Sequence, residues 1–280
     1  MEFLERRRTL VEDRLVAVVD DVEPDGLGEQ LAHVTLSGGK RVRPMVTVLS
    51  CEAVGGEAED AVDFGVGIEL VHNASLVIDD LIDRSALRRG TESAWTAYGY
   101  GPAILASDGL LGEAFALFSP DPRAMQVVAE AMVELGEGEA TELAAMPTNE
   151  AEYMELARRK TGALFRAAAE LGAIAGGADA VTVECFGEYA ERVGVAFQIR
   201  DDVLAATADA DDLGKPTGHD AELGRPSIVE ITDLGVAAAN DRARAESDRA
   251  LAALDRAAVE DEAACDYLRD LAEFVVVRER

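Results

Sequence analysis

The sequence predicts an all-α protein, a single large helical bundle that spans residues 1–280. Hydrophobic residues make up 49% of the chain but aromatic residues only 5%, and alanine and leucine dominate the apolar positions. This composition favours helices, because strands prefer β-branched and aromatic side chains. Apolar residues also recur at helical spacing through most of the chain. The sequence contains neither alternating strands nor a glycine-rich nucleotide-binding loop, and no linker or short-period repeat divides it.

The predicted helices of the first half follow this spacing. Residues 2–22 place Leu4, Leu10 and Leu15 on one side of a helix, and the segment around Pro24 breaks it. A short helix then leads to a glycine-rich turn. The following segments are predicted as helix at 45–55, helix at 59–83, a connection with glycine and aromatic residues at 91–101, and helix at 103–118.

The second half continues as helices separated by short turns. A helix is predicted at 124–146, a loop and N-cap at 147–152, and a further helix that stops at Gly176-Gly177. Residues 179–206 form the next predicted helix, and residues 221–280 are mostly helical in pattern. A bundle of this size is expected to hold its ligand in a central cavity between helices.

Composition and charge exclude several kinds of partner. The net charge is −29 and the pI is near 4.3, so nucleic acid and an acidic membrane surface are not expected to bind. No apolar run approaches about 18 residues, so no membrane span is expected. The three cysteines are far apart and indicate neither disulfides nor zinc, and the N-terminus has no signal-peptide core. A cytoplasmic location follows as an expectation.

Lysine is nearly absent from this acidic chain. It occurs only at Lys40, Lys160 and Lys215, and all other basic side chains are arginine apart from three histidines. An acid-rich, lysine-poor surface suits a cytoplasm of high salt, because screening weakens the repulsion between like charges. We therefore hypothesise a halophilic origin. A lysine that persists in such a chain indicates a place where a compact ammonium group is required.

An acidic motif lies within the apolar run from 76 to 90. Asp79 and Asp83 are four residues apart, so they share one face of a helix, and their like charges repel. A cation between the carboxylates would offset that repulsion, and oxygen ligands favour Mg²⁺. Arg88 and Arg89 follow at a distance suited to a phosphate group. The alternative is a solvated acidic turn, which the acidic composition makes nearly as plausible for this stretch taken alone.

Further candidate residues lie elsewhere in the chain. Gly38-Gly39 is followed by Lys40, Arg41 and Arg43, a pattern that suits an anion-binding loop at the start of a helix. His72 lies two turns before Asp79 on roughly the same face. A second acidic pair, Asp201-Asp202, ends another apolar helix. Together with the sparse lysines, these residues indicate a polyanionic substrate bridged by Mg²⁺.

The ordered set of motifs resembles the trans-isoprenyl diphosphate synthases, or polyprenyl synthetases, particularly geranylgeranyl-diphosphate-synthase-like members. The similarity covers nearly the whole chain. Each motif alone is weakly specific, but their order is highly specific. The motifs are Gly38 to Pro44, His72 with Asp79 to Asp83, Arg88 to Gly90, Ala103 to Phe115, Lys160 to Gly162, Gln198 to Asp202, Gly214 to Pro216, and Phe274 to Arg278.

This resemblance implies an isoprenoid-synthase fold and a Mg²⁺-dependent prenyltransferase. An allylic diphosphate would bind through Mg²⁺ to Asp79, Asp83 and Asp201, with Asp80 and Asp202 helping through water or an outer layer of contacts. Arg88, Lys160 and Lys215 would contact this diphosphate. Isopentenyl diphosphate would bind to Lys40, Arg43, His72 and Arg89, and Thr161 and Gln198 would steady the carbocation.

Several positions depart from the family pattern. Ala205 stands where the second acidic motif usually has its last Asp, so an alternative is a catalytically weak paralogue that serves as a prenyl-diphosphate-binding or regulatory subunit. A class I terpene cyclase is a third reading, but a cyclase has no use for the isopentenyl diphosphate site. The other departures are Ile78 and Trp95 for histidine, Glu92 for proline, Ser107 for glycine and Arg225 for lysine.

Small residues precede the first acidic motif. Ala74 and Ser75 lie five and four residues before Asp79, where family members that stop at fifteen carbons often have an aromatic residue. The resemblance therefore implies a deep channel and a product of about twenty carbons or more. Val71 or Phe115 is expected to form its floor. A homodimer is expected from the family alone.

Overall fold

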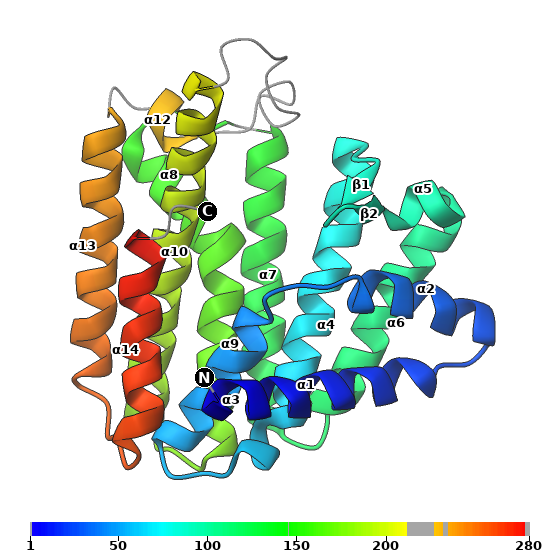
Figure 1. Ribbon diagram of the computed structural model, residues 1–280, viewed down its shortest axis with the longest axis horizontal. Helices are drawn as coiled ribbons and strands as arrows, with labels where there is room; N and C mark the ends of the chain where they lie inside the picture. The colour runs from blue at the N-terminus through cyan, green and yellow to red at the C-terminus, as the bar shows by residue number, and fades with distance from the viewer. Residues whose placement is uncertain (1, 145, 212–226, 232–234, 278–280) are drawn as a thin grey trace.

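The protein is a bundle of long helices, and two further helices, α1 (Glu2–Asp20) and α2 (Asp25–Leu36), lie across it (Figure 1). The computed structural model describes residues 2–144, 146–211, 227–231 and 235–277. The predicted all-α fold is confirmed. In the described part of the chain, strands occur only as a two-residue antiparallel ladder in which Leu87 pairs with Glu92 and Arg88 with Thr91.

The first four helices closely match the prediction. Helix α1 buries Val11, Leu15 and Val18 on its apolar side and lies across one end of the bundle. Helix α4 is the central element, and it packs along α3, α6 and α9. A capping box between Glu57 and Asp60 begins it. The bounds are α1 Glu2–Asp20, α2 Asp25–Leu36, α3 Val42–Ala53 and α4 Ala58–Asp83.

The segment that follows α4 contains more structure than the predicted connection at 91–101. Its hairpin consists of β1 (Leu87–Arg88) and β2 (Thr91–Glu92), and a short α5 (Ala94–Tyr98) precedes α6 (Tyr100–Phe118). Trp95 Nε1 donates to the carbonyl oxygen of Ser85 at 2.9 Å and holds α5 against the end of α4. Such elements are too short to produce a readable periodicity, which explains why the sequence did not reveal them.

The helix predicted to end at Gly176 is interrupted. It consists of α8 (Glu150–Ala157), a π-helical turn η1 (Arg158–Gly162) and α9 (Ala163–Ala175), and it follows α7 (Pro122–Ala144). Asn149 caps α8 by accepting from the Glu152 amide at 3.1 Å, and Gly176 ends α9. A π turn inserts one residue into the helical register and frequently marks a functional position. Here it carries Lys160 and Thr161.

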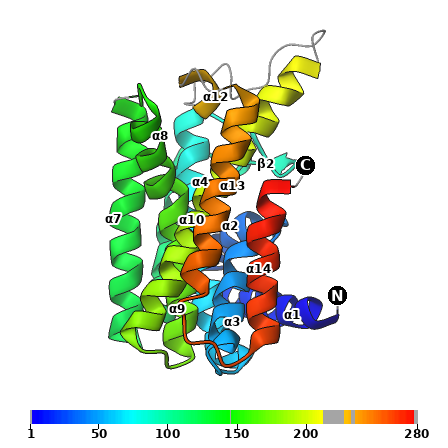
Figure 2. The same cartoon turned by 90° about the vertical axis from the view of Figure 1, so that its left-hand side faces the viewer.

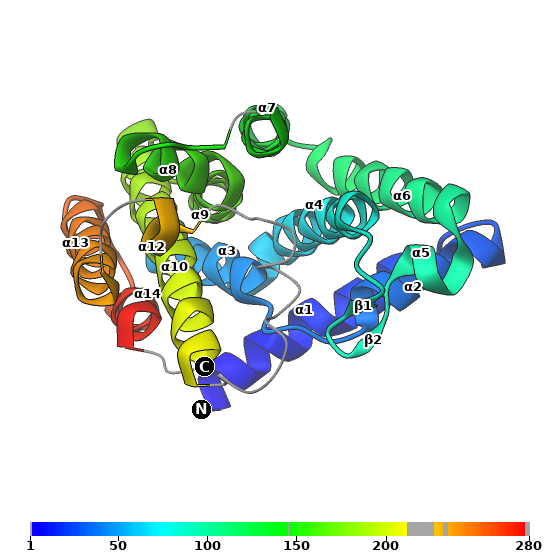
Figure 3. The same cartoon turned by 90° about the horizontal axis from the view of Figure 1, so that it is seen from above.

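The last helices complete the bundle. Helix α10 (Ala180–Asp211) extends beyond the predicted 179–206, and α12 (Ile228–Ile231), α13 (Val236–Leu254) and α14 (Glu262–Val277) follow. Figures 2 and 3 show α13 beside α10, with α14 next to them. The main core fills the space among α1, α3, α4, α6, α7, α9, α10 and α14. A smaller apolar cluster around Tyr153, Ile199 and Ile228 joins α8, α10, α12 and α13.

Two described helices are long and apolar enough to cross a membrane by length and composition alone. They are α4 and α6. In the apolar 18-residue stretch of each helix, 67% and 33% of the residues, respectively, are buried inside the protein. The burial of α4 is typical of a core helix. Much of α6 is exposed, and that outer apolar face needs a separate explanation. The expected absence of a membrane span stays a prediction.

Candidate active site

The three acids at the end of α4 have different surroundings. Asp79 and Asp83 lie on one side of the helix, as their spacing predicts. Asp80 is buried and faces the hairpin, where its carboxylate accepts from Arg88 Nε at 3.0 Å and from Arg88 Nη2 at 2.5 Å. Asp80 therefore anchors the arginine that was expected to contact the diphosphate.

Lys160 lies opposite two acids of α7 that sequence reasoning had not assigned to the site. Its Nζ donates to Glu142 and, at 3.2 Å, to Glu139. Burial alone would lower the pKa of Lys160, but the carboxylates of Glu142, Glu139 and Asp79 outweigh it and raise that pKa. Burial and the Asp79 charge raise the pKa of Glu139 to about 7. Lys160 thus lies within a group of carboxylates that includes Asp79.

A second group beside α4 is cationic. Burial, and then the charges of Arg43, Arg89 and Arg88, lower the pKa of His72 well below its usual range. Burial, with the Arg89 charge, lowers the pKa of Arg43 to about 10. The Arg43 guanidinium carbon lies 4.6 Å from the centre of the Phe165 ring. Three of the residues predicted to bind isopentenyl diphosphate are therefore close together.

The glycine-rich turn brings Arg89 to this cationic group. Gly38 and Gly39 have φ angles of 93° and 145°, which favour glycine because other side chains strain this backbone. Arg89 Nη1 donates to the Gly38 carbonyl oxygen. Lys40, the remaining predicted ligand, is exposed on the same turn. Arg41 has a different role, because it is buried and paired with Glu12 and Glu69.

The second acidic motif is connected to the π turn. Thr161 Oγ1 donates to Gln198 Oε1 at 2.8 Å, and Gln198 Nε2 donates to Asp202 Oδ1 at 3.0 Å. Asp202 Oδ2 also accepts from the Tyr153 hydroxyl at 2.6 Å. Because Thr161 follows Lys160, these contacts link the carboxylate group around Asp79 to the second half of α10.

Helices α4 and α10 end on the same side of the bundle (Figures 1 and 2). Asp79 to Asp83 form the last turn of α4, whereas Asp201-Asp202 lie in the second half of α10, more than two turns before its end at Asp211. Asp201 precedes Asp202 on α10, and Ala205 is exposed one turn later. Lys215, Gly214, Pro216, Arg225 and Arg278 lie outside the described residues. The structure therefore gathers described site residues into three groups: Asp79 with Lys160, His72 with Arg43, Arg88 and Arg89, and Thr161 with Gln198 and Asp202.

The donor chemistry of this end fits a hard divalent cation. Asp79, Asp83 and Asp201 offer only carboxylate oxygens, which are the ligands that Mg²⁺ prefers. Among the described residues, no three carboxylate, histidine or cysteine side chains are grouped closely enough to hold a metal by themselves. Mg²⁺ in proteins commonly takes one or two carboxylates together with water and substrate phosphate oxygens.

The structure shows the surroundings of the described residues that differ from the family pattern. Trp95 ties α5 to the end of α4, and Ser107 Oγ donates to the Ala74 carbonyl oxygen at 3.2 Å, which joins α6 to α4. His33 Nε2 lies 2.7 Å from the Glu92 carbonyl oxygen. Ile78 is exposed on α4. Trp95 and Ser107 therefore contribute to packing around the site.

Sequence reasoning missed Glu139, Glu142 and Tyr153 as neighbours of the site. The first two lie three residues apart on α7, so they share a face, and this spacing was a usable signal. In so acidic a chain the same spacing occurs often, which hid it. Tyr153 gave no comparable signal, because its partner Asp202 is 49 residues away in the sequence.

Comparisons with known proteins identify the family of this chain. The family model for polyprenyl synthetase matches residues 24–265. A short chain isoprenyl diphosphate synthase of Methanothermobacter thermautotrophicus is 34% identical over 253 residues, covering 87% of this chain and 78% of that protein. A geranylfarnesyl diphosphate synthase of Aeropyrum pernix is 35% identical over 288 aligned positions, covering 92% and 87%.

A crystal structure of a geranylgeranyl pyrophosphate synthetase from Pyrococcus horikoshii has the same fold. Its TM-score is 0.89 at 32% identity, and the alignment covers 99% of this chain and 98% of that one. The match includes the helices that carry both acidic motifs and the lysine-bearing turn between them. With this agreement of fold, motifs and relatives, the chain is a member of the polyprenyl synthetase family and an enzyme of the prenyltransferase class.

Proposed function

We propose that this protein is a Mg²⁺-dependent isoprenyl diphosphate synthase. It condenses an allylic diphosphate with isopentenyl diphosphate to give a longer trans-polyprenyl diphosphate. The observation that supports this best is the presence of two groups of opposite charge at one end of α4. Asp79 lies near Lys160 and its acidic partners, whereas His72 lies among Arg43, Arg88 and Arg89. A reaction between two diphosphates requires two anion-binding sites, and here one would be formed by carboxylates with Mg²⁺ and the other by basic side chains.

The allylic diphosphate occupies the carboxylate-rich side. Asp79, Asp83 and Asp201 would hold Mg²⁺, which when bound would supply Lewis-acid stabilisation of the charge that develops on the departing pyrophosphate. Lys160 adds a positive charge, and Glu139 and Glu142 hold its ammonium group in place. Arg88, oriented by Asp80, adds a guanidinium group suited to phosphate oxygens. Lys215, outside the described residues, is expected to join them.

Isopentenyl diphosphate occupies the cationic side. Arg43, Arg89 and Lys40 supply positive charge, and neutral His72 offers a ring N–H as a hydrogen-bond donor. The Nε atom of Arg43 is buried and has no hydrogen-bond partner among the described residues. A buried donor without a partner is costly, so this guanidinium group is suited to receiving an anion.

Chemistry then follows by ionisation, condensation and elimination. The allylic C–O bond breaks, and its electron pair leaves with pyrophosphate. The double bond of isopentenyl diphosphate forms a new C–C bond to the allylic cation, and loss of a proton restores a double bond. The departing pyrophosphate accepts this proton. Thr161 and Gln198 present oxygen dipoles that stabilise the cation without forming a bond to it.

Labelled isopentenyl diphosphate tests this proposal. The purified protein is incubated with Mg²⁺, high salt and each allylic primer, and labelled products are separated by chain length. We expect incorporation that disappears when Mg²⁺ is chelated. Binding without turnover would instead support the weak paralogue indicated by Ala205, and a cyclic hydrocarbon without incorporation would support the cyclase.

We propose a product of about twenty carbons. Ala74 is buried and small, and Val71 lies one turn before it on α4. One further turn down, a Cβ atom at Gly67 would lie only 2.5 Å from Cζ of Phe118, so this ring closes over the helix at Gly67. Gly67 is seven residues from Ala74, or about 10 Å along the helix. Phe118 is therefore a stronger candidate for the floor than Phe115.

We also propose a homodimer. Helix α6 exposes Tyr100, Ile104 and Leu105, the last with 62% of its surface accessible. Apolar side chains grouped on one helix favour burial against a partner. Light scattering should give twice the monomer mass, and Leu105→Asp should give the monomer. An unchanged mass for that variant would place any dimer interface elsewhere.

A further inference from the structure

The Asp202 carboxylate accepts hydrogen bonds from donors on three helices. Its Oδ2 atom accepts from the Tyr153 hydroxyl of α8 at 2.6 Å and from the Ile228 amide of α12 at 3.0 Å. Its Oδ1 atom accepts from Gln198 Nε2, one turn earlier on α10, at 3.0 Å. Both carboxylate oxygens therefore already have partners within the protein.

Burial makes these contacts costly to exchange. Tyr153 is only 2% exposed and packs in the smaller apolar cluster with Ile199 and Ile228. If Asp202 turned toward a metal ion, the Tyr153 hydroxyl and the Ile228 amide would lose a charged acceptor in an apolar environment. A metal-binding role for Asp202 would therefore have to compensate for two broken hydrogen bonds.

The same contacts fix the orientation of Gln198. Asp202 is an acceptor only, so the amide nitrogen of Gln198 faces it, and the amide oxygen faces the Thr161 hydroxyl. Thr161 uses its single proton in that contact. Toward a substrate it can therefore present only lone pairs, which is the polarity that stabilises a cation.

We propose that Asp202 and Tyr153 are positioning residues rather than parts of the metal site. Tyr153 holds the Asp202 carboxylate, which orients Gln198 and, through it, the Thr161 hydroxyl. This inference rests on the proposed function, since the oriented oxygens matter only if a carbocation forms.

The first test measures binding without turnover. Calorimetry gives the dissociation constant of inorganic pyrophosphate in the presence of Mg²⁺. Asp201→Asn should weaken binding by about tenfold or more, whereas Asp202→Asn and Tyr153→Phe should change it by less than about threefold. Equal weakening by Asp201→Asn and Asp202→Asn would identify Asp202 as a metal ligand and overturn the proposal. Absence of binding to the unmodified protein would overturn both this inference and the proposed function.

The second test separates kcat from KM. Tyr153→Phe and Asp202→Asn should each lower kcat about tenfold and leave both KM values nearly unchanged, because orientation of Thr161 and Gln198 acts on the cation. The double variant should be no slower than the slower single variant, since both changes break one relay. Unchanged kcat in Tyr153→Phe would overturn the proposal.

Tyr189→Phe is the matched control. Tyr189 is also buried, and its hydroxyl donates to the Leu268 carbonyl oxygen at 2.6 Å, away from the site. It should lose thermal stability but keep kcat. An equal loss of kcat in both tyrosine variants would mean that Tyr153 only supports the fold. The proposed function would be refuted if the protein bound Mg²⁺ and pyrophosphate but incorporated no isopentenyl diphosphate. The kcat effect inferred for Tyr153 would then be refuted as well. The binding test would still decide whether Asp202 is a metal ligand.

Discussion

Asp79, Asp80 and Asp83 are close in sequence but differ in chemistry. Asp79 and Asp83 share one face of α4, and Asp79 lies near Lys160, whereas Asp80 binds Arg88 on the hairpin side. A motif of acids therefore combines metal-binding candidates with a structural anchor. The same division recurs on α10, where we assign Asp201 to the metal and Asp202 to positioning.

Asn substitutions should reveal this division on α4. We expect Asp79→Asn and Asp83→Asn each to lower kcat/KM by about a hundredfold or more, with a higher Mg²⁺ requirement, because a metal ligand is lost. Asp80→Asn should lower it less, without changing the Mg²⁺ requirement. Steady-state rates over a Mg²⁺ titration measure both quantities. A similar Mg²⁺ requirement in all three variants would contradict the assignment.

Product length should depend on the face of α4 below Asp79. Ala74→Phe should shorten the main product by one or more five-carbon units, because the ring fills the upper channel. Chromatography of dephosphorylated products measures this length. A control substitution on α4 must avoid the main core, where Ala61, for example, is buried. Glu59→Phe, at an exposed position on the same helix, is the suitable control and should leave the product unchanged.

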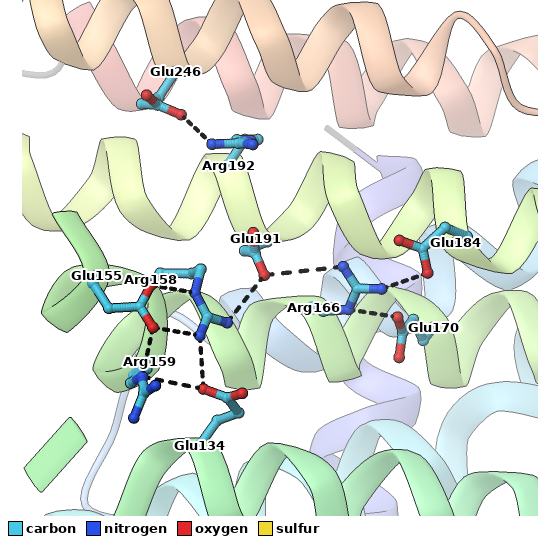
Figure 4. A network of polar contacts seen from close by, with 10 residues as sticks. All are labelled: Glu134, Glu155, Arg158, Arg159, Arg166, Glu170, Glu184, Glu191, Arg192 and Glu246. Carbon is cyan, nitrogen blue, oxygen red and sulfur yellow. Dashed lines mark hydrogen bonds and ion pairs between the residues drawn. The ribbon is translucent and has the colours of Figure 1, made fainter. Parts of the chain in front are cut away.

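At the scale of elements, the π turn η1 decides which side chains face the site. It places Lys160 toward α7 and Thr161 toward α10, although the two are adjacent in sequence. The arginines preceding them bind elsewhere. Figure 4 shows Arg158 between Glu155, Glu134 and Glu191, and Arg166 of α9 with its own acidic partners. This network holds α7, α8, α9 and α10 together beside the site.

Glu170 gives the network a dependence on pH. Burial is the main cause, and it raises the pKa of Glu170 to about 7 although Arg166 lies 2.8 Å away; Glu184, Glu130 and Glu191 contribute in the same direction. The folded state therefore retains a proton that the unfolded state has lost, and stability falls as pH rises from about 4.5 to about 7.

Glu170→Gln should remove this dependence. Relative to the variant, the unmodified protein should lose roughly 1–3 kcal/mol of unfolding free energy between pH 4.5 and pH 7.5. Urea unfolding at both pH values measures the difference. Parallel curves for the two proteins across this range would show that Glu170 titrates normally.

At the scale of the molecule, a net charge of −29 opposes the compact state. Added KCl should therefore raise the midpoint of thermal unfolding, because it screens repulsion between exposed acids. Replacing the exposed Glu59, Asp270 and Glu273 with lysine should reduce this salt dependence. A midpoint that does not change between low and molar KCl would count against the halophilic hypothesis. We also predict that the whole chain unfolds as one domain, and the same experiment tests this.

The sequence by itself determined the helical fold and the two helices that carry the acidic motifs. These features depend on local periodicity and on residue type, which are readable along the chain. It did not reveal the hairpin, α5 or the π turn, since each is too short to repeat a pattern.

Only the tertiary structure decided which side chains meet. The pairing of Lys160 with Glu139 and Glu142, the cationic group around His72, and the relay from Tyr153 to Thr161 all join different helices. Such contacts depend on how each helix is rotated and packed, and spacing within one helix carries no record of that rotation. The physical reason is that helix formation is local, whereas burial and electrostatics act between elements.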